Sequence, residues 1–230
     1  MNKPTSALIT LSLGVLAARG QELPGDEHQS RLGSLEEVIV TAQRREENLQ
    51  SVPIAVTALS GDELQRLQIN DVNRLQYATP SLIIWPVIGN SNTATISLRG
   101  QVEPDLVPTN DPAVGTYLDG VYIARMTGAN LELVDMQRVE VLRGPQGTLF
   151  GRNAIGGAIN LISNPPVRQF EGNMTAEIGN YSSADLTGVV NFPVDLYQGA
   201  LRVAAKHSEH RGYGRAVLLG RDLSDDDTNY

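Results

Sequence analysis

Three consecutive segments that follow a double proline alternate between polar and apolar side chains. A period of two places successive side chains on opposite faces of a β-strand, so each segment has one apolar face and one mostly polar face. Segments of about ten residues with this pattern are typical of transmembrane β-strands, and a soluble antiparallel sandwich shows a similar alternation. The mostly polar set comprises Asn173, Thr175 and Glu177, then Asp185, Thr187, Val189 and Asn191, then Arg202, Ala204 and Lys206.

The connections between these segments favour membrane strands. The turn at 195–199 is short whereas the segment 207–230 is long and polar, and outer-membrane barrels combine short turns on one side with long loops on the other. Aromatic residues lie near the segment ends, where an aromatic girdle would sit: Phe170, Tyr181, Phe192, Tyr197 and Tyr213. We therefore expect residues 167–230 to form the first strands of a transmembrane antiparallel β-barrel, which the chain leaves incomplete.

The N-terminus has the pattern of a secretory signal peptide. A lysine supplies a positive charge, residues 7–18 are almost wholly apolar, and Ala18 and Gly20 are small residues at the positions that precede a cleavage site. We predict a signal peptide over residues 1–20. The apolar run is shorter than the roughly 20 residues that a membrane-spanning helix needs, which disfavours an N-terminal anchor.

Composition argues against several classes of function. A net charge of −8 disfavours nucleic-acid binding, because a phosphate backbone needs a basic face. The absence of cysteine removes disulfides, thiolate metal sites and cysteine nucleophiles. There is no G-x-S-x-G elbow, and the three histidines lack a carboxylate or cysteine constellation. We therefore predict that the chain is not an enzyme, binds no nucleic acid and has neither a cofactor nor a metal site.

Residues 51–166 have the pattern of an α+β domain. Ser60 and Glu63 form a capping box that starts a short helix, and we expect Asn70 to cap a second helix that ends before a proline. An Asp-Gly pair between two apolar runs predicts a tight hairpin. Together the strand-like runs predict a small mixed sheet of about four or five strands with short helices. These runs are 54–59, 93–98, 114–118, 121–123, 138–142 and 158–162.

Residues 21–50 are expected to form a flexible leader. Most of this segment is polar and aperiodic, but 36–42 is a short β-branched island between two polar tethers. No partner strand is obvious in the adjacent domain. The island therefore has two interpretations: it adds to the sheet edge of another protein, or it is an ordinary edge strand, which composition alone favours.

A glycine-rich run from 143 to 160 joins two of the predicted strands. Glycine-rich loops can wrap phosphate groups, but neither the lysine of a Walker loop nor the glycine spacing of a dinucleotide fingerprint occurs here. We interpret the run as strand, turn-rich loop and strand, in which the glycines permit sharp turns and close packing.

Four motifs follow one another in order: Val-Pro-Ile-Ala-Val at 52–56, Ile-Ser-Leu-Arg-Gly at 96–100, the segment 114–122 around the Asp-Gly pair, and the glycine-rich run. Their order and spacing resemble the plug domains of TonB-dependent outer-membrane receptors, in the branch that transports iron complexes. The resemblance extends over residues 35–213, and each motif is weak by itself. Phe150 stands where tyrosine is common in the family, a substitution that keeps the ring.

The resemblance implies roles for two sets of residues. The first is the TonB box, an exported strand that pairs with a periplasmic energy transducer: Glu37, Val38, Ile39, Val40, Thr41 and Ala42. The second is the set of plug and gating motifs: Arg99, Gly100, Asp119, Gly120, Arg143, Gly144, Pro145, Gly147, Gly151, Arg152, Gly156 and Gly157. The glycines would let the plug loops fold tightly inside the barrel, and Arg99, Arg143 and Arg152 would meet carboxylates on the barrel wall. Alternation places four charged residues on the lumen side: Glu177, Asp185, Arg202 and Lys206.

The implied function is active transport across the outer membrane of a Gram-negative bacterium. A ligand binds above the plug, the TonB box is released to the periplasm, and the transducer pulls the plug aside. The expected ligand is a ferric siderophore or another iron complex, with vitamin B12, other metals and carbohydrates as alternatives. The implied partners are the TonB-type transducer, the extracellular ligand and, for the complete receptor, outer-membrane lipid.

Receptors of this kind close about 22 strands around the plug. We therefore interpret the chain as an N-terminal fragment of a receptor. The alternative is a soluble periplasmic plug-like binding module that forms no pore. An in-frame continuation rich in alternating segments would favour the receptor, and a genuine stop codon after Tyr230 would favour the module.

Overall fold

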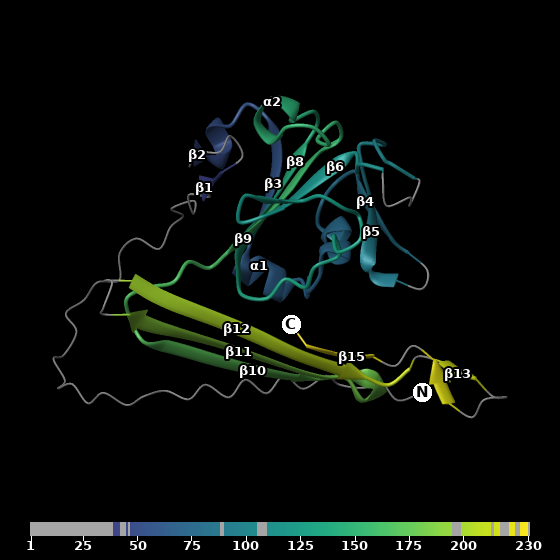
Figure 1. Ribbon diagram of the computed structural model, residues 1–230, viewed down its shortest axis with the longest axis vertical. Helices are drawn as coiled ribbons and strands as arrows, with labels where there is room; N and C mark the ends of the chain where they lie inside the picture. The colour runs from purple at the N-terminus through teal and green to yellow at the C-terminus, as the bar shows by residue number, and fades with distance from the viewer. Residues whose placement is uncertain are drawn as a thin grey trace, which may run out of the picture.

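A five-stranded mixed sheet organises the first part of the chain (Figure 1). Its strand order is β3 (Ala55–Ser60), β8 (Met136–Arg143), β9 (Gly157–Ser163), β6 (Val114–Leu118) and β7 (Val121–Ile123). The pairs are antiparallel except that β6 runs parallel to β9. This arrangement confirms the predicted small mixed sheet, except that the run 93–98 lies outside it and pairs with residues 82–87 in a separate hairpin.

The computed structural model describes residues 39–41, 45, 47–87, 90–104, 110–194, 199–212, 214–216, 221–223 and 226–229. The predicted signal peptide lies outside the described residues. So do Glu37, Val38 and Ala42 of the predicted TonB box.

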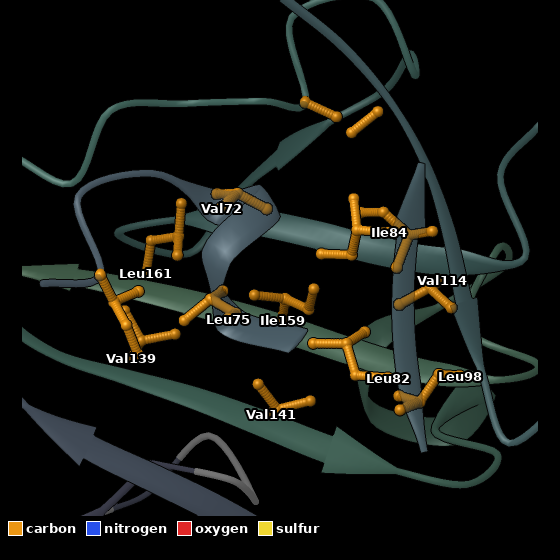
Figure 2. Close-up of a cluster of buried hydrophobic side chains, with 14 of the residues drawn as sticks. Val72, Leu75, Leu82, Ile84, Leu98, Val114, Val139, Val141, Ile159 and Leu161 are labelled. Atoms are coloured by element: carbon orange, nitrogen blue, oxygen red, sulfur yellow. The ribbon is translucent and has the colours of Figure 1, made fainter. Parts of the chain in front are cut away.

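One face of the sheet packs against the largest hydrophobic cluster. Helix α1 (Gly61–Arg66), the 3₁₀ helix η2 (Val72–Tyr77) and the hairpin of β4 (Leu82–Val87) and β5 (Asn90–Leu98) cover this face. Figure 2 shows the side chains that meet there, which come from the covering elements and from the sheet strands: Val72, Leu75, Leu82, Ile84, Leu98, Val114, Val139, Val141, Ile159 and Leu161.

Local sequence signals explain the ends of these helices. Ser60 Oγ accepts from the Glu63 backbone N–H and Glu63 accepts from the Ser60 backbone N–H, which confirms the predicted capping box. The second predicted helix is a 3₁₀ helix, and its cap is Asp71 rather than Asn70. The Asp71 carboxylate accepts from the backbone N–H of Arg74 at 3.0 Å. An Asp directly before the first turn competes successfully for the cap because its charge also suits the helix N-terminus.

A tight turn at Asp119 and Gly120 joins β6 to β7, as the sequence predicts. Their φ angles are 48° and 80°, and positive φ at both central residues is what this hairpin turn requires. The Asp119 carboxylate also accepts from the backbone N–H and the hydroxyl of Ser163 at 2.9 and 2.7 Å. The turn is therefore tied to the end of β9.

The glycine-rich run is a strand, a loop with one helical turn, and a strand. Strand β8 ends at Arg143, α2 (Gly147–Phe150) forms the helical turn, and β9 returns antiparallel to β8. This confirms the interpretation made from the sequence.

The second part of the chain is an antiparallel sheet that runs alongside the first (Figure 1). Its strands are β10 (Glu171–Ile178), β11 (Ala184–Val194), β12 (Gly199–His210) and β15 (Asp226–Asn229), in that order. We call β10, β11 and β12 the strand wall. The 3₁₀ helix η3 (Asn180–Ser182) joins β10 to β11, and β13 (Gly214–Ala216) and β14 (Arg221–Leu223) form a separate pair. The described strands do not close into a barrel.

The two faces of the strand wall differ as the alternation predicts. Thr175, Glu177 and Asp185 point to the N-terminal domain and line a cavity with it. On the opposite face Met174 and Ile178 are 61% and 67% exposed. The wall thus presents a polar face to its own chain and an apolar face outward.

Candidate functional site

The described part of the predicted TonB box, Ile39 to Thr41, is folded onto the N-terminal domain. Strand β1 (Ile39–Val40) pairs antiparallel with β2 (Glu47–Asn48), which the 3₁₀ helix η1 (Leu49–Ser51) follows. Part of the predicted leader therefore carries regular structure, and it supplies the partner strand that the sequence did not reveal.

Burial holds this strand in place. The Val40 side chain has no exposed surface and joins Tyr117, Leu142 and Phe150 in a second hydrophobic cluster. That cluster lies on the sheet face opposite the one in Figure 2, because Leu142 alternates with Val141 along β8. Ile39, by contrast, is 44% exposed. Burying a valine side chain stabilises the docked position by roughly 1.5–3 kcal/mol.

Thr41 adds polar contacts to a buried carboxylate. Its backbone N–H donates to Glu140 Oε1 at 2.7 Å, and its hydroxyl lies 3.1 Å from the same oxygen. Arg138 Nε donates to that oxygen at 2.8 Å. Glu140 itself is fully buried on β8. The residue that follows β1 is thus bonded to β8, although 99 positions separate Thr41 from Glu140 in the chain.

Two glycines in the glycine-rich run leave no room for a side chain. A Cβ atom on Gly157 would lie 2.1 Å from the Leu142 carbonyl oxygen, and the φ angle of Gly157 is +146°. A Cβ atom on Gly156 would lie 2.9 Å from Cβ of Gln101. These positions hold the loop close to the neighbouring strands, as close packing requires.

Other members of the predicted motif set act through turns and local contacts. Arg99 and Gly100 both have positive φ, at 54° and 78°. A Cβ atom on Gly144 would lie 3.2 Å from Arg99 Nη1, so the two motifs meet in space. Gly147 begins α2, Gly151 ends it with φ +78°, and Pro145 lies between Gly144 and the cap of α2.

No hydrogen bond or ion pair joins Arg99, Arg143 or Arg152 to the strand wall among the described residues. Arg152 lies 3.8 Å from Asp111 of its own domain and is largely exposed. The Nε atom of Arg143 is buried without a hydrogen-bond partner in the described part of the structure. The expectation that these arginines meet carboxylates on the barrel wall stays a prediction, because the described strands do not form a closed barrel.

In the ion pairs that join the two parts of the chain, the wall supplies the cations and the N-terminal domain supplies the carboxylates. Arg202 of β12 donates to both Asp135 oxygens, from Nε at 2.5 Å and from Nη2 at 2.7 Å. Lys206 of the same strand lies 2.8 Å from Glu132 Oε2. We call these four residues the interdomain clasp. The wall supplies the cations because alternation points Arg202 and Lys206 inward, and the segment before β8 supplies the anions.

Comparison with known proteins fits this arrangement. Residues 48–158 match the family model of the TonB-dependent Receptor Plug Domain. This segment is a TonB-dependent receptor plug domain. We refer to it below as the plug, and the whole predicted set of plug and gating motifs, from Arg99 to Gly157, lies within it.

A sequence match and a structural match, both from Yersinia pestis, extend beyond the plug. The pesticin receptor is 34% identical over 158 residues, which are 66% of this chain and 23% of that receptor. The crystal structure of the ferric yersiniabactin uptake receptor FyuA matches with a TM-score of 0.65 and 30% identity, covering 76% of this chain and 27% of that one. The pyoverdine outer membrane receptor FpvA of Pseudomonas aeruginosa shares the fold at 19% identity, with a TM-score of 0.63 over 76% of this chain and 25% of its own.

The chain spans about a quarter of the length of the relatives it matches. Those relatives are receptors by name and not enzymes, in agreement with the sequence prediction. In the described part of the chain there is no cluster of three or more metal-ligating side chains. No helix among the described residues is long and apolar enough to cross a membrane.

A buried asparagine fixes the connector between the plug and the wall. Asn191 of β11 has no exposed surface. Its amide nitrogen donates to the carbonyl oxygens of Val167 and Gln169, both at 2.5 Å, and its side-chain oxygen accepts from the Val167 backbone N–H at 2.9 Å. The connector is therefore bonded to the wall directly after the double proline.

A polar cavity of about 410 Å³ separates the plug from the strand wall. Asp62, Glu177, Asp185 and Lys206 contribute to its lining. Burial raises the pKa of Glu132, and the neighbouring carboxylates of Asp71 and Asp185 raise it too, whereas Lys206 acts in the opposite direction.

Sequence reasoning missed the residues that connect the docked strand and the wall to the plug. Glu140 had a visible signal, because a carboxylate interrupts the apolar run of β8. Glu132 and Asp135 lie in an irregular segment, where no periodicity marks which side chains point to the wall. Asn191 was read as one polar position among several.

Proposed function

We propose that the chain is the N-terminal portion of a TonB-dependent receptor that transports a ferric siderophore or another iron complex across the outer membrane. The observation that carries this proposal is a plug whose N-terminal strand is docked and whose flank is held by ion pairs to a wall of alternating strands. An iron complex is the cargo suggested by the relatives, one of which is named a ferric yersiniabactin uptake receptor.

In this mechanism the residues of the plug couple ligand binding to the release of the TonB box. Binding of the ligand on the outer side shifts the plug toward a state in which residues 37–42 are free. The freed strand then pairs with a strand edge of the periplasmic transducer, because backbone hydrogen bonds supply affinity with little dependence on sequence. Traction on that strand moves the plug relative to the wall, and the clasp and the polar cavity provide a hydrated boundary at which this displacement occurs.

The expected location is the outer membrane, with the apolar face of β10, β11 and β12 toward lipid. The alternative, a soluble periplasmic plug-like module, predicts that the full-length gene product stays in the soluble periplasmic fraction. Recovery from the outer-membrane fraction after cell lysis supports the receptor.

The substitution Val40→Pro tests the assignment of the TonB box. Proline removes the backbone N–H that a paired strand donates, so we expect transducer binding and energised uptake by the full-length gene product to be lost. The measurements are binding of the purified periplasmic domain of TonB and uptake of radioactive ferric siderophore. The control is Ile39→Val, which keeps the N–H group and a β-branched side chain. Unchanged uptake in the proline variant would refute the assignment.

A further inference from the structure

A buried carboxylate with no role in the proposed transport lies in the middle of β8. Glu140 is fully buried, and its cross-strand neighbours Ala58 and Asn160 carry no charge. An ionised carboxylate in such a place is costly unless charged or hydrogen-bonding groups compensate it. The groups that compensate the Glu140 carboxylate therefore indicate its role.

The groups that compensate Glu140 come from two sources. Arg138, two residues away on the same strand, donates from Nε at 2.8 Å. Thr41 donates its backbone N–H at 2.7 Å, and its hydroxyl lies within 3.1 and 3.3 Å of the two carboxylate oxygens. One source belongs permanently to the sheet, and the other belongs to the strand that must leave when the transducer binds.

We propose that Glu140 is a positioning residue that holds the TonB box in its docked state. This inference rests on the proposed function. Arg138 neutralises the carboxylate in both states, whereas Thr41 is bound in the docked state alone. The carboxylate thereby sets the fraction of receptor whose box is available before a ligand arrives.

We call the contact between Glu140 and Thr41 the latch. It can hold the box with little dependence on side-chain identity, because it uses mainly the backbone of Thr41. The shortest bond uses the N–H of Thr41, which every residue except proline carries. A hydrogen bond from a backbone N–H to a carboxylate is charge-assisted and stronger than one between neutral groups. The burial of Val40 adds an apolar contact beside it, so the box is held at two adjacent positions.

Replacing Glu140 by glutamine tests the proposal, since it retains the shape and removes the charge. In the ligand-free, full-length gene product we expect affinity for the purified periplasmic domain of TonB to rise about tenfold, because the charge-assisted hydrogen bond from Thr41 becomes a weaker neutral one. The matched control is Glu47→Gln. Glu47 also lies beside the box but forms its ion pair with Arg45, so its replacement should leave affinity unchanged.

Trypsin cleavage after Arg45 in the absence of TonB gives a second readout. Arg45 is exposed in the docked state, but the pairing of β1 with β2 restrains the backbone around it. Release of the box removes this restraint, so E140Q should be cleaved faster than the wild type. Thr41→Val keeps the backbone N–H but loses the hydroxyl, and it should show a smaller increase. This variant lies outside the sheet and tests the latch even if E140Q fails to fold.

The outcomes separate the latch from the proposed function. If V40P still binds TonB, the box assignment fails and the latch fails with it. If V40P abolishes binding while E140Q and T41V leave both affinity and cleavage at the wild-type level, the latch alone is refuted. Increased affinity and cleavage in E140Q and T41V, with the affinity of E47Q at the wild-type level, support it.

Discussion

Glycines that look alike in the sequence are constrained by different forces in the structure. Gly157 combines a positive φ with a position where an added Cβ atom would lie 2.1 Å from the Leu142 carbonyl oxygen, so both conformation and space exclude a side chain. Gly120 needs positive φ in a turn that is open to solvent. Gly147 has open space around it and begins a helical turn. The motif is therefore a mixture of strict and tolerant positions.

The substitution Gly157→Ala should destabilise the plug by about 2–4 kcal/mol, because it adds both steric overlap and backbone strain. Gly147→Ala should be neutral or stabilise it by a few tenths of a kcal/mol to about 1 kcal/mol, because alanine favours a helix. Hydrogen exchange of β8 and β9 amides in the full-length gene product measures both effects. Equal protection in the two variants would contradict this account of the loop.

The raised pKa of Glu132 predicts that the free energy of unfolding depends on pH. Its pKa is raised in the folded state, chiefly by burial, so the folded state binds protons more tightly than the unfolded state. The stabilisation linked to this proton is fully present below the ordinary pKa near 4.5 and is lost as pH rises through the raised value. Relative to Glu132→Gln, the wild type should lose stability over that interval. Parallel pH profiles of chemical unfolding would contradict the prediction.

At the scale of elements, the clasp joins the segment before β8 to β12 through two nearly buried ion pairs. Loss of one partner leaves a buried charge without compensation, which is more costly than the pair is favourable. Asp135 also has a φ of 52°, which Asp tolerates better than most residues. Asp135 therefore serves both the backbone turn and the contact with the wall.

Asp135→Asn and Arg202→Met should each destabilise the contact between plug and wall by roughly 3 kcal/mol. The double variant should cost less than the sum, because the second change removes the orphaned charge. Hydrogen exchange of segment 130–137 measures each free energy. Arg66→Met is the control, since its ion pair spans 3.9 Å and is exposed, and it should change stability by less than about 1 kcal/mol. Full additivity in the double variant would show that the two residues act independently.

The sequence was informative where a periodic pattern or a specific turn decided the structure. The capping box at Ser60, the hairpin at Asp119 and the alternating strand wall follow from local chemistry. The docking of Val40 and the contacts of Glu140 do not, because they join residues about a hundred positions apart in the chain. The polarity of the clasp was missed for the same reason. Alternation shows which wall residues point inward but not what they meet.

At the scale of the whole molecule, the strand wall has one face for the plug and one apolar face that the described chain leaves uncovered. Neighbouring residues on β10 therefore lie in different environments. Met174 is exposed on the outer face, and Thr175 lines the polar cavity. If the outer face contacts lipid, as proposed, identical changes at these two positions should have different consequences.

Met174→Arg should impair assembly of the full-length gene product into the outer membrane, with a cost of about 2–4 kcal/mol near the bilayer centre. Thr175→Arg should be tolerated, because it places the cation in a polar cavity near Glu177 and Asp185. The amount of folded protein in the outer membrane, judged by heat-modifiable gel mobility, compares the two. Equal assembly of both variants would argue against lipid contact on this face.

The strand order also determines when each strand of the newly made polypeptide can pair. The edge strand β3 has to wait for β8, and β6 has to wait for β9, because those partners come much later in the chain. Such distant pairings form slowly and leave early strands exposed meanwhile. Synthesis of the glycine-rich run thus governs when the first half can become protected, and a pause before it would prolong the need for chaperones.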